Sequence, residues 1–137
     1  MTALTPHMFL QPDGWVPAKG YANGVLAEGR MVFTGGLVGW NAEQKWDHED
    51  MVGQFRQTLE NIVTVLAEAG ARPEHLVRLT WYITDKQEYL ANLRGFGAAY
   101  REVIGRHFPA MAVVQVVALM EDEAKVEIEA TAVIPHD

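Results

Sequence analysis

The most regular pattern of apolar and polar residues lies near the C-terminus. Between residues 126 and 132, apolar side chains occupy every second position, and Glu127, Glu129 and Thr131 occupy the positions between them. Side chains of a strand point alternately to opposite faces of its sheet. We therefore predict a strand over residues 124–134 that has one apolar face and one acidic face.

The segment before this strand carries an almost uninterrupted apolar run. Residues 111–120 are apolar apart from Gln115, and residues 121–123 are all acidic. A run of this kind is typical of a strand that is covered on both faces. The pattern predicts that the two strands form a hairpin joined by an exposed acidic turn. An acidic row beside a covered strand makes this hairpin the preferred place for chemistry.

The N-terminal part of the chain reads as an irregular segment followed by a hairpin. Residues 1–20 are rich in proline, glycine and polar residues and are expected to be irregular. From Tyr21 onward, two short apolar runs flank a turn at residues 28–29 and predict a hairpin. The pair Gly35–Gly36 interrupts the second run. A glycine inside a strand indicates a bulge or a close approach of the backbone, for instance to a ligand, and both interpretations stay open.

The middle of the chain shows two helical stretches separated by a strand. After Asp47, which is the expected N-cap, apolar residues at helical spacing predict an amphipathic helix that ends at Gly70. Residues 76–84 alternate between apolar and polar and predict a strand. A second helix is expected from about residue 87 to residue 104, capped by Asp85 or the residue before it.

These elements give the order β-β-α-β-α-β-β and predict an α+β fold. Two helices on one face of a mixed sheet form a two-layer sandwich, and residues 1–137 are expected to make a single domain. The other sheet face would carry Val113, Val117 and Leu119 or their alternates. A face this apolar is expected to be buried between subunits.

Composition removes several classes of function. The formal net charge of −7 argues against a nucleic-acid surface, which needs clustered positive charge. The sequence has no cysteine and no serine, which excludes thiolate catalysis and a Ser-His-Asp triad. The five histidines are scattered, so no metal site is expected. No apolar run reaches the length of a membrane span and no secretory leader is visible, so we expect a cytoplasmic protein without a membrane partner.

Five motifs, in matching order and spacing, resemble those of one protein family. They are VFTGGLVG (32–39), QFRQTLENIVTVLAEAGA (54–71), HLVRLTWYITD (75–85), FPA (108–110) and VEIEATAV (126–133). Together they cover most of the chain and resemble the RidA/YjgF/YER057c/UK114 family, also named endoribonuclease L-PSP. The resemblance implies a chorismate-mutase-like fold and a homotrimer with a substrate cleft between each pair of subunits. It also implies hydrolysis of imines or enamines to a ketone and ammonia, without a metal or organic cofactor.

Two substrate-binding positions implied by the resemblance differ here from the family. An arginine that binds the substrate carboxylate follows the Phe-Pro-Ala motif in the family, whereas this chain has Met111. The next position, usually Ser, Thr or Cys, is Ala112. A thioether cannot replace the paired hydrogen bonds that a guanidinium makes with a carboxylate. The usual 2-imino acids are therefore not expected as substrates.

Other site positions of the family are kept. The resemblance assigns hydrogen-bond donation to Tyr21 and substrate or water binding to the backbone at Gly35, with Gly36 beside it. It assigns water positioning or proton transfer to Glu127. Each has a plainer interpretation, because Tyr21 also suits the start of a strand and Glu127 also suits a solvated or subunit-lining acidic face.

The loop before the first helix bears on substrate size. Trp40, Trp46 and His48 are placed to close over the cleft, and a tryptophan-lined pocket favours a larger, flatter molecule. A conjugated enamine such as 2-aminomuconate is the substrate class that this predicts, with Trp40 among the binding residues. The arginines available to replace the missing anchor are Arg78, Arg94, Arg101 and Arg106. A solvated helix or strand face explains each of these arginines equally well.

Two functions follow from these observations. The first is an imine or enamine deaminase with a non-standard substrate, favoured by the retained Tyr21, Gly35 and Glu127. The alternative is a non-catalytic trimer that binds a small metabolite in the same clefts, favoured by the missing arginine. A ribonuclease ranks third, because the chain is acidic and shows no clustered basic groove.

Overall fold

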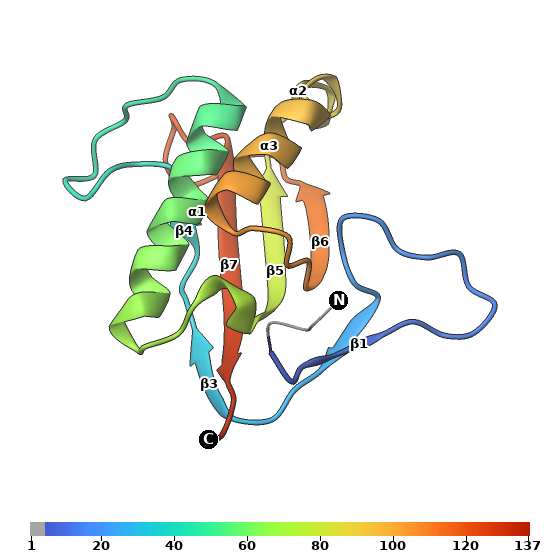
Figure 1. Ribbon diagram of the computed structural model, residues 1–137. Coiled ribbons are helices and arrows are strands. Elements are labelled where there is room, and N and C mark those ends of the chain that lie inside the picture. The colour runs from blue at the N-terminus through green and yellow to red at the C-terminus, as the bar shows by residue number, and fades with distance from the viewer. Residues whose placement is uncertain (1–4) are drawn as a thin grey trace.

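The computed structural model describes residues 5–137 and shows helices packed on one face of a mixed β-sheet (Figure 1). The strands are β1 (Met8–Leu10), β2 (Gly24–Leu26), β3 (Arg30–Phe33), β4 (Leu37–Val38), β5 (Leu76–Ile83), β6 (Ala110–Gln115) and β7 (Val126–Ile134). The helices are α1 (Met51–Glu68), the 3-10 turn η1 (Pro73–His75), α2 (Lys86–Ala91) and α3 (Leu93–Val103). The expected two-layer α+β architecture is confirmed.

Strand β7 is the central strand of the main sheet. It pairs antiparallel with β5 on one side and with both β3 and β4 on the other, and β6 pairs in parallel with β5 at the outer edge. The predicted alternation is confirmed, because one face of β7 is buried and the other is not. The buried residues are Val126, Ile128, Ala130 and Ala132. Glu129 is exposed on the opposite face, with Glu127 half-buried beside it.

The Gly35–Gly36 interruption is a bulge between β3 and β4. Phe33 pairs with Thr131 and Leu37 pairs with Ile128, so four steps along one strand match three steps along β7. One extra residue in an antiparallel pair bends the strand and ends regular pairing. The bulge interpretation of these glycines is therefore confirmed, while a role in ligand binding stays a prediction.

Helix α1 has the predicted buried stripe but a different N-cap. Asp50 caps the helix through a carboxylate oxygen that accepts a 2.8 Å hydrogen bond from the backbone N of Gly53. Asp47, the expected cap, instead accepts from the side chain of Asn41 in the preceding loop. The fully buried apolar residues of the stripe are Met51, Phe55, Leu59, Ile62 and Leu66. Burying each such side chain stabilises the fold by roughly 1.5–3 kcal/mol.

The predicted second helix is two helices. Helix α2 begins after Asp85, whose carboxylate accepts from the backbone N of Glu88, and this cap is confirmed. The break falls at Asn92, whose side chain donates a 2.7 Å hydrogen bond to the carbonyl of Glu88. Asparagine side chains compete with the backbone in this way, which ends the first helix. Leu90 and Leu93, two apolar residues of these helices, are 46% and 50% exposed.

The predicted N-terminal hairpin is wrong. Strand β2 pairs with β1 in a separate two-stranded sheet, and β3 pairs with β7. Residues 8–10 are therefore a strand inside the segment expected to be irregular, and residues 1–4 lie outside the described part of the chain. Gly29 explains the change of partner, because a Cβ there would lie 1.9 Å from the carbonyl oxygen of Ile134. Because the backbone at Gly29 passes so close to Ile134, the residues that follow, β3, pair with β7.

The predicted C-terminal hairpin is also wrong. Strand β5 lies between β6 and β7, and the connection passes the end of β5. There Val116 donates a backbone hydrogen bond to Ile83, and Thr84 donates one to Lys125. The predicted strand over residues 111–120 stops at Gln115, and the apolar residues beyond it form an exposed loop. A continuous apolar run has no period and does not show where a strand ends.

The sheet face opposite the helices is exposed, and it carries the alternate Val114 in place of the three residues named first. Val113 faces the helices and packs against the core, and Val117 and Leu119 belong to the loop after β6. The apolar side chains that are exposed on strands flanking this face are Met31, Phe33 and Val114. Beside them, the Tyr82 hydroxyl donates a 2.8 Å hydrogen bond to Glu129 across the β5–β7 pair. This bond raises the pKa of Tyr82, so the phenol stays protonated.

Three buried histidines tie the N-terminal segment to one end of the sheet. The Nε2 atom of His7 lies 3.0 Å from the carbonyl oxygen of Val133, and that of His107 lies 2.7 Å from the carbonyl oxygen of Leu76. His75 accepts a 2.9 Å hydrogen bond at Nδ1 from the backbone N of Arg72. Burial lowers the pKa of His75 and of His107, although Glu74 opposes the shift at both. The folded chain therefore favours the neutral imidazole at His75 and at His107.

The free energy of unfolding is predicted to fall as the pH decreases below about 6.5, the ordinary pKa of histidine. Below this value the unfolded chain binds protons that the buried His75 and His107 resist, so protonation favours unfolding. Urea denaturation at about pH 7.5, 6.5 and 5.5 measures the effect. His75→Gln should reduce the dependence of the free energy of unfolding on pH, whereas His136→Gln, at an exposed position, should not. A stability that increases toward pH 5.5 would contradict this account.

Candidate functional site

A large, partly apolar cavity lies beside the edge strand β6, and two predicted site residues line it. Its volume is about 710 Å³, which is in the range of small-molecule sites. Tyr21 and Met111 both line it. Tyr21 reaches this position because Ala22 bridges to the start of β6, its backbone N donating to the carbonyl of Pro109. Most of the other side chains of the wall come from β5, β6, α2 and α3, and the rest from the loops before Tyr21 and before β6.

Aromatic rings form most of this wall. The remaining lining residues are Lys19, Gly20, Trp81, Tyr89, Leu93, Phe96, Gly97, Tyr100, Arg101, Phe108 and Val113. Trp81 lies edge-on to Tyr89 at a centroid distance of 6.3 Å, and Tyr100 stacks on Phe108 at 5.3 Å. Offset and edge-to-face contacts of this kind hold aromatic rings in fixed orientations. The cavity is therefore a rigid, flat-walled space.

The polar atoms of the aromatic residues differ in availability. The Tyr100 hydroxyl donates to the carbonyl of His107, so it is already engaged. Trp81 is 6% exposed, and its buried indole Nε1–H has no hydrogen-bond partner within residues 5–137. A buried donor without an acceptor costs about 1–3 kcal/mol. Burial raises the pKa of Tyr89, which keeps that phenol protonated. The Trp81 donor is thus unpaired among the described residues and closed off from solvent.

Glu127 lies elsewhere, on the sheet face away from the helices. It pairs with Tyr82 of β5 and Val38 of β4. A Cβ at Gly36 would lie 2.3 Å from its Oε1 atom, so the carboxylate occupies the space that a side chain at Gly36 would need. A Cβ at Gly35 would meet no atom within 4 Å. The bulge therefore brings Glu127 and Gly36 together and leaves Gly35 open.

The predicted site residues fall into two groups in one chain. Met111 pairs with Leu79 and packs against the helix-side core, so it shares a cavity with Tyr21. Ala112 pairs with Thr80 and faces the other side of the sheet, which is the side of Glu127. The two groups line no common cavity among the described residues. A single molecule can contact both groups only if they come from different subunits.

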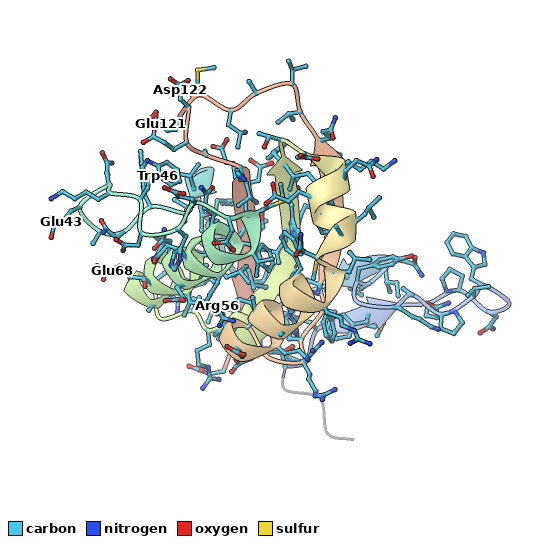
Figure 2. The ribbon with its side chains drawn as sticks, turned by 90° about the horizontal axis from the view of Figure 1, so that it is seen from above. Glu43, Trp46, Arg56, Glu68, Glu121 and Asp122 are labelled. Atoms are coloured by element: carbon cyan, nitrogen blue, oxygen red, sulfur yellow. The ribbon has the colours of Figure 1, made fainter. Side chains whose placement is uncertain are left out.

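The tryptophan loop lines a different cavity. Trp46 and His48 border a hollow of about 660 Å³ together with the acidic residues 121–123. Figure 2 shows Trp46 on one loop and Glu121 and Asp122 on the neighbouring loop, at the same end of the molecule. Trp40 packs on Trp46 at a centroid distance of 5.7 Å, and its carbonyl accepts from Asn61 of α1. In one chain this loop does not border the cavity of Met111.

Several lining residues of the Met111 cavity escaped sequence reasoning as site residues. Trp81 and Phe96 have the spacing of a buried strand face and a buried helix stripe. This spacing identifies them as core residues and not as site residues. Arg101 carried no signal beyond its charge.

Two absences also bear on the chemistry. Within residues 5–137, no three potential metal-ligating side chains cluster, and no helix is both long and apolar enough to cross a bilayer.

A methyl group at Gly36 is predicted to displace the Glu127 carboxylate. Gly36→Ala places Cβ where Oε1 now lies, and the flexible end of the glutamate moves while the sheet stays. Gly35→Ala is the matched control, because its Cβ enters open space. Crystal structures of both variants measure the position of Oε1. An unmoved carboxylate in Gly36→Ala would contradict the packing described.

Comparisons with known proteins place this geometry in a family. The model of the endoribonuclease L-PSP family matches residues 13–134. Protein DfrA of Myxococcus xanthus is 37% identical over 77% of this chain and 77% of its own length. A 2-iminobutanoate/2-iminopropanoate deaminase of Salmonella typhimurium is 32% identical over 77% of this chain and 80% of its own.

A solved structure supports the same assignment. A Rid-family protein of unknown function, YyfB of Yersinia pestis, superimposes with a TM-score of 0.84 at 30% identity, covering 95% of this chain and 100% of its own. The agreement extends over nearly the whole fold, including helices packed on one face of a mixed sheet. The chain therefore belongs to the Rid, or YjgF/YER057c/UK114, family of endoribonuclease L-PSP-like proteins.

Proposed function

We propose that the chain is a deaminase that hydrolyses the C=N bond of a flat, conjugated imine or enamine. Two relatives that are 32% and 31% identical to the chain are 2-iminobutanoate/2-iminopropanoate deaminases, which supports the reaction type. The substrate differs, because Met111 stands where the family resemblance calls for the arginine that binds a 2-imino acid. A 2-aminomuconate-like compound represents the proposed class.

The observation that carries this proposal is the aromatic cavity at Met111. Its volume of about 710 Å³ exceeds what a three- or four-carbon imino acid needs. The aromatic rings among the lining residues favour a planar, conjugated molecule, because aromatic faces stack on π-systems. Met111 adds a flexible, polarizable thioether to these walls. A large, mainly apolar cavity therefore accompanies the absence of the arginine.

The proposed reaction needs one proton carrier and one attacking water. An enamine first converts to its imine, and Glu127 takes a proton from water as the oxygen bonds to the imine carbon. Glu127 then passes this proton to the nitrogen, which gives a carbinolamine. It next takes the proton of the carbinolamine hydroxyl and delivers it to the nitrogen, so that the C–N bond breaks to release a ketone and ammonia. Tyr21 donates a hydrogen bond to the substrate, and the backbone at Gly35 orients the water.

This arrangement requires more than one subunit. Tyr21 and Met111 lie on the helix side of the edge strand β6, whereas Glu127 lies on the opposite sheet face. We propose a homotrimer in which the Glu127 group of one subunit faces the Tyr21 group of the next. The exposed apolar residues Met31, Phe33 and Val114 supply surface that association would bury.

One observation favours a second function. Met111 and Ala112 remove the guanidinium and the hydroxyl or thiol from the family's substrate-binding positions. A trimer that keeps the cleft but binds a small metabolite without turning it over would tolerate this loss. The kinetic experiment below separates the two functions.

Ammonia release is predicted from conjugated enamines such as 2-aminomuconate, and not from 2-iminopropanoate or 2-iminobutanoate. Glu127→Gln should lower kcat by about 100-fold or more, because general acid–base catalysis is lost. Tyr21→Phe should lower kcat/KM by roughly tenfold through the loss of one hydrogen bond. Release is measured with a coupled glutamate dehydrogenase assay. No release above buffer from any substrate, with measurable binding of the same compounds, would favour the non-catalytic trimer.

Met111→Arg is the matched variant for substrate class. It restores the family's anchor and should increase activity on 2-iminobutanoate while decreasing activity on the conjugated enamine. An unchanged preference would mean that Met111 does not set specificity.

The mass in solution is predicted to be three times the 15.3 kDa of the chain. Light scattering coupled to size-exclusion chromatography measures it directly. A species of single-chain mass at micromolar concentration would contradict the intersubunit site.

A further inference from the structure

We propose that Arg101 binds a carboxylate of the ligand in the Met111 cavity, so that the cavity takes a planar, conjugated carboxylate. This assignment rests on the proposed function for the identity of the site, but its test does not require turnover. It replaces the missing arginine of β6 with a guanidinium that comes from helix α3.

The charge of the cavity wall is opposite to that of the chain. Arg101 and Lys19 both line the cavity, and no aspartate or glutamate does. The chain as a whole has 18 acidic and 11 basic residues, and the neighbouring cavity at Trp46 is bordered by four carboxylates. Two cations without a carboxylate in the same wall favour an anionic ligand.

The guanidinium of Arg101 is available for a ligand. No salt bridge within residues 5–137 involves Arg101, whereas the next residue, Glu102, pairs with Arg56 of α1. Arg101 lies across Gly97, since a Cβ at Gly97 would be 3.1 Å from its Nη1 atom. Gly97, which also lines the cavity, therefore leaves room for the guanidinium at the cavity wall.

The indole of Trp81 is not a further donor to this ligand. Its Nε1–H lacks an acceptor among the described residues, but the atom is buried and closed off from solvent. Arg101 therefore supplies the contact to the carboxylate, beside the aromatic rings that line the cavity. A planar molecule with a carboxylate matches this combination.

The other arginines named from the sequence do not meet these conditions. Arg106 borders a separate hollow on the other side of Tyr21, lined by residues of the N-terminal segment. Arg78 borders a hollow at the opposite end of β5 from Ile83, beside Ala110 and Thr131. Arg94 borders neither of these hollows nor the Met111 cavity. Arg106 is an exposed arginine in the segment that follows α3, and it makes a matched control.

The test is calorimetric binding of trans,trans-muconate, a stable, planar dicarboxylate without an amino group. Wild-type protein should bind it, and Arg101→Gln should weaken binding about tenfold or more. Arg101→Lys should restore part of the loss, because an ammonium keeps the charge without the paired hydrogen bonds. Arg106→Gln should change binding by less than twofold. The neutral dimethyl ester of muconate should bind wild type and Arg101→Gln equally, and thermal unfolding confirms that each variant is folded.

Each outcome bears on the assignment separately from catalysis. Muconate that fails to bind wild type, or binds Arg101→Gln as tightly, overturns the role of Arg101. An equal loss in Arg106→Gln or in the neutral ester also overturns it, because the effect would not then be a charge contact in this cavity. Loss confined to Arg101→Gln with muconate supports it, whether or not any enamine releases ammonia.

Discussion

The pairing of β7 is the constraint on which the rest of the structure depends. This strand pairs along both sides, so its alternating side chains are committed to opposite faces over its whole length. Val126 to Ala132 send every second side chain into the core under α1. Glu127 and Glu129 must then face away from the helices, and a shift of one residue would bury carboxylates. The position of the proposed proton carrier is thus fixed by the packing of the core.

The bulge and the edge strand place the remaining site groups relative to β7. The extra residue at Gly35–Gly36 opens the neighbouring pair and leaves space that the Glu127 carboxylate fills. At the other edge, β6 has no strand beyond it in the described chain and carries Met111 at the mouth of an aromatic cavity. The separation of Glu127 from Met111 by the sheet is what leads to a site shared between subunits. Arg101 of α3 lines the same cavity as Met111 and supplies positive charge there.

The sequence predicted those parts of the fold in which a period is visible. The alternation in β7 and the helical stripe of α1 each have a period, and both were confirmed. Strand partners were not predictable, because neighbouring strands in sequence suggest hairpins, and here Gly29 and the loop after Gln115 send the chain to other strands. The break at Asn92 depends on one side-chain hydrogen bond, which no period reveals.

The sequence named candidate site residues but could not show how they are grouped. Motif resemblance singled out Tyr21, Met111 and Glu127, yet the side of the sheet on which each lies follows from strand order. The aromatic wall was hidden because Trp81 and Phe96 have the spacing of ordinary core residues. Gly97 has no side chain and leaves space for the guanidinium of Arg101, on which the proposed role of Arg101 depends. Proximity of this kind leaves no pattern along the chain.

The most direct test of a site shared between subunits is subunit complementation. Tyr21→Ala and Glu127→Gln are each expected to inactivate the protein, and differently tagged copies can be co-expressed and the mixed assemblies purified through both tags. The account predicts that mixed assemblies recover ammonia release well above either variant alone, because one of their clefts combines an intact Tyr21 with an intact Glu127. Mixed assemblies that remain as inactive as the single variants would contradict it.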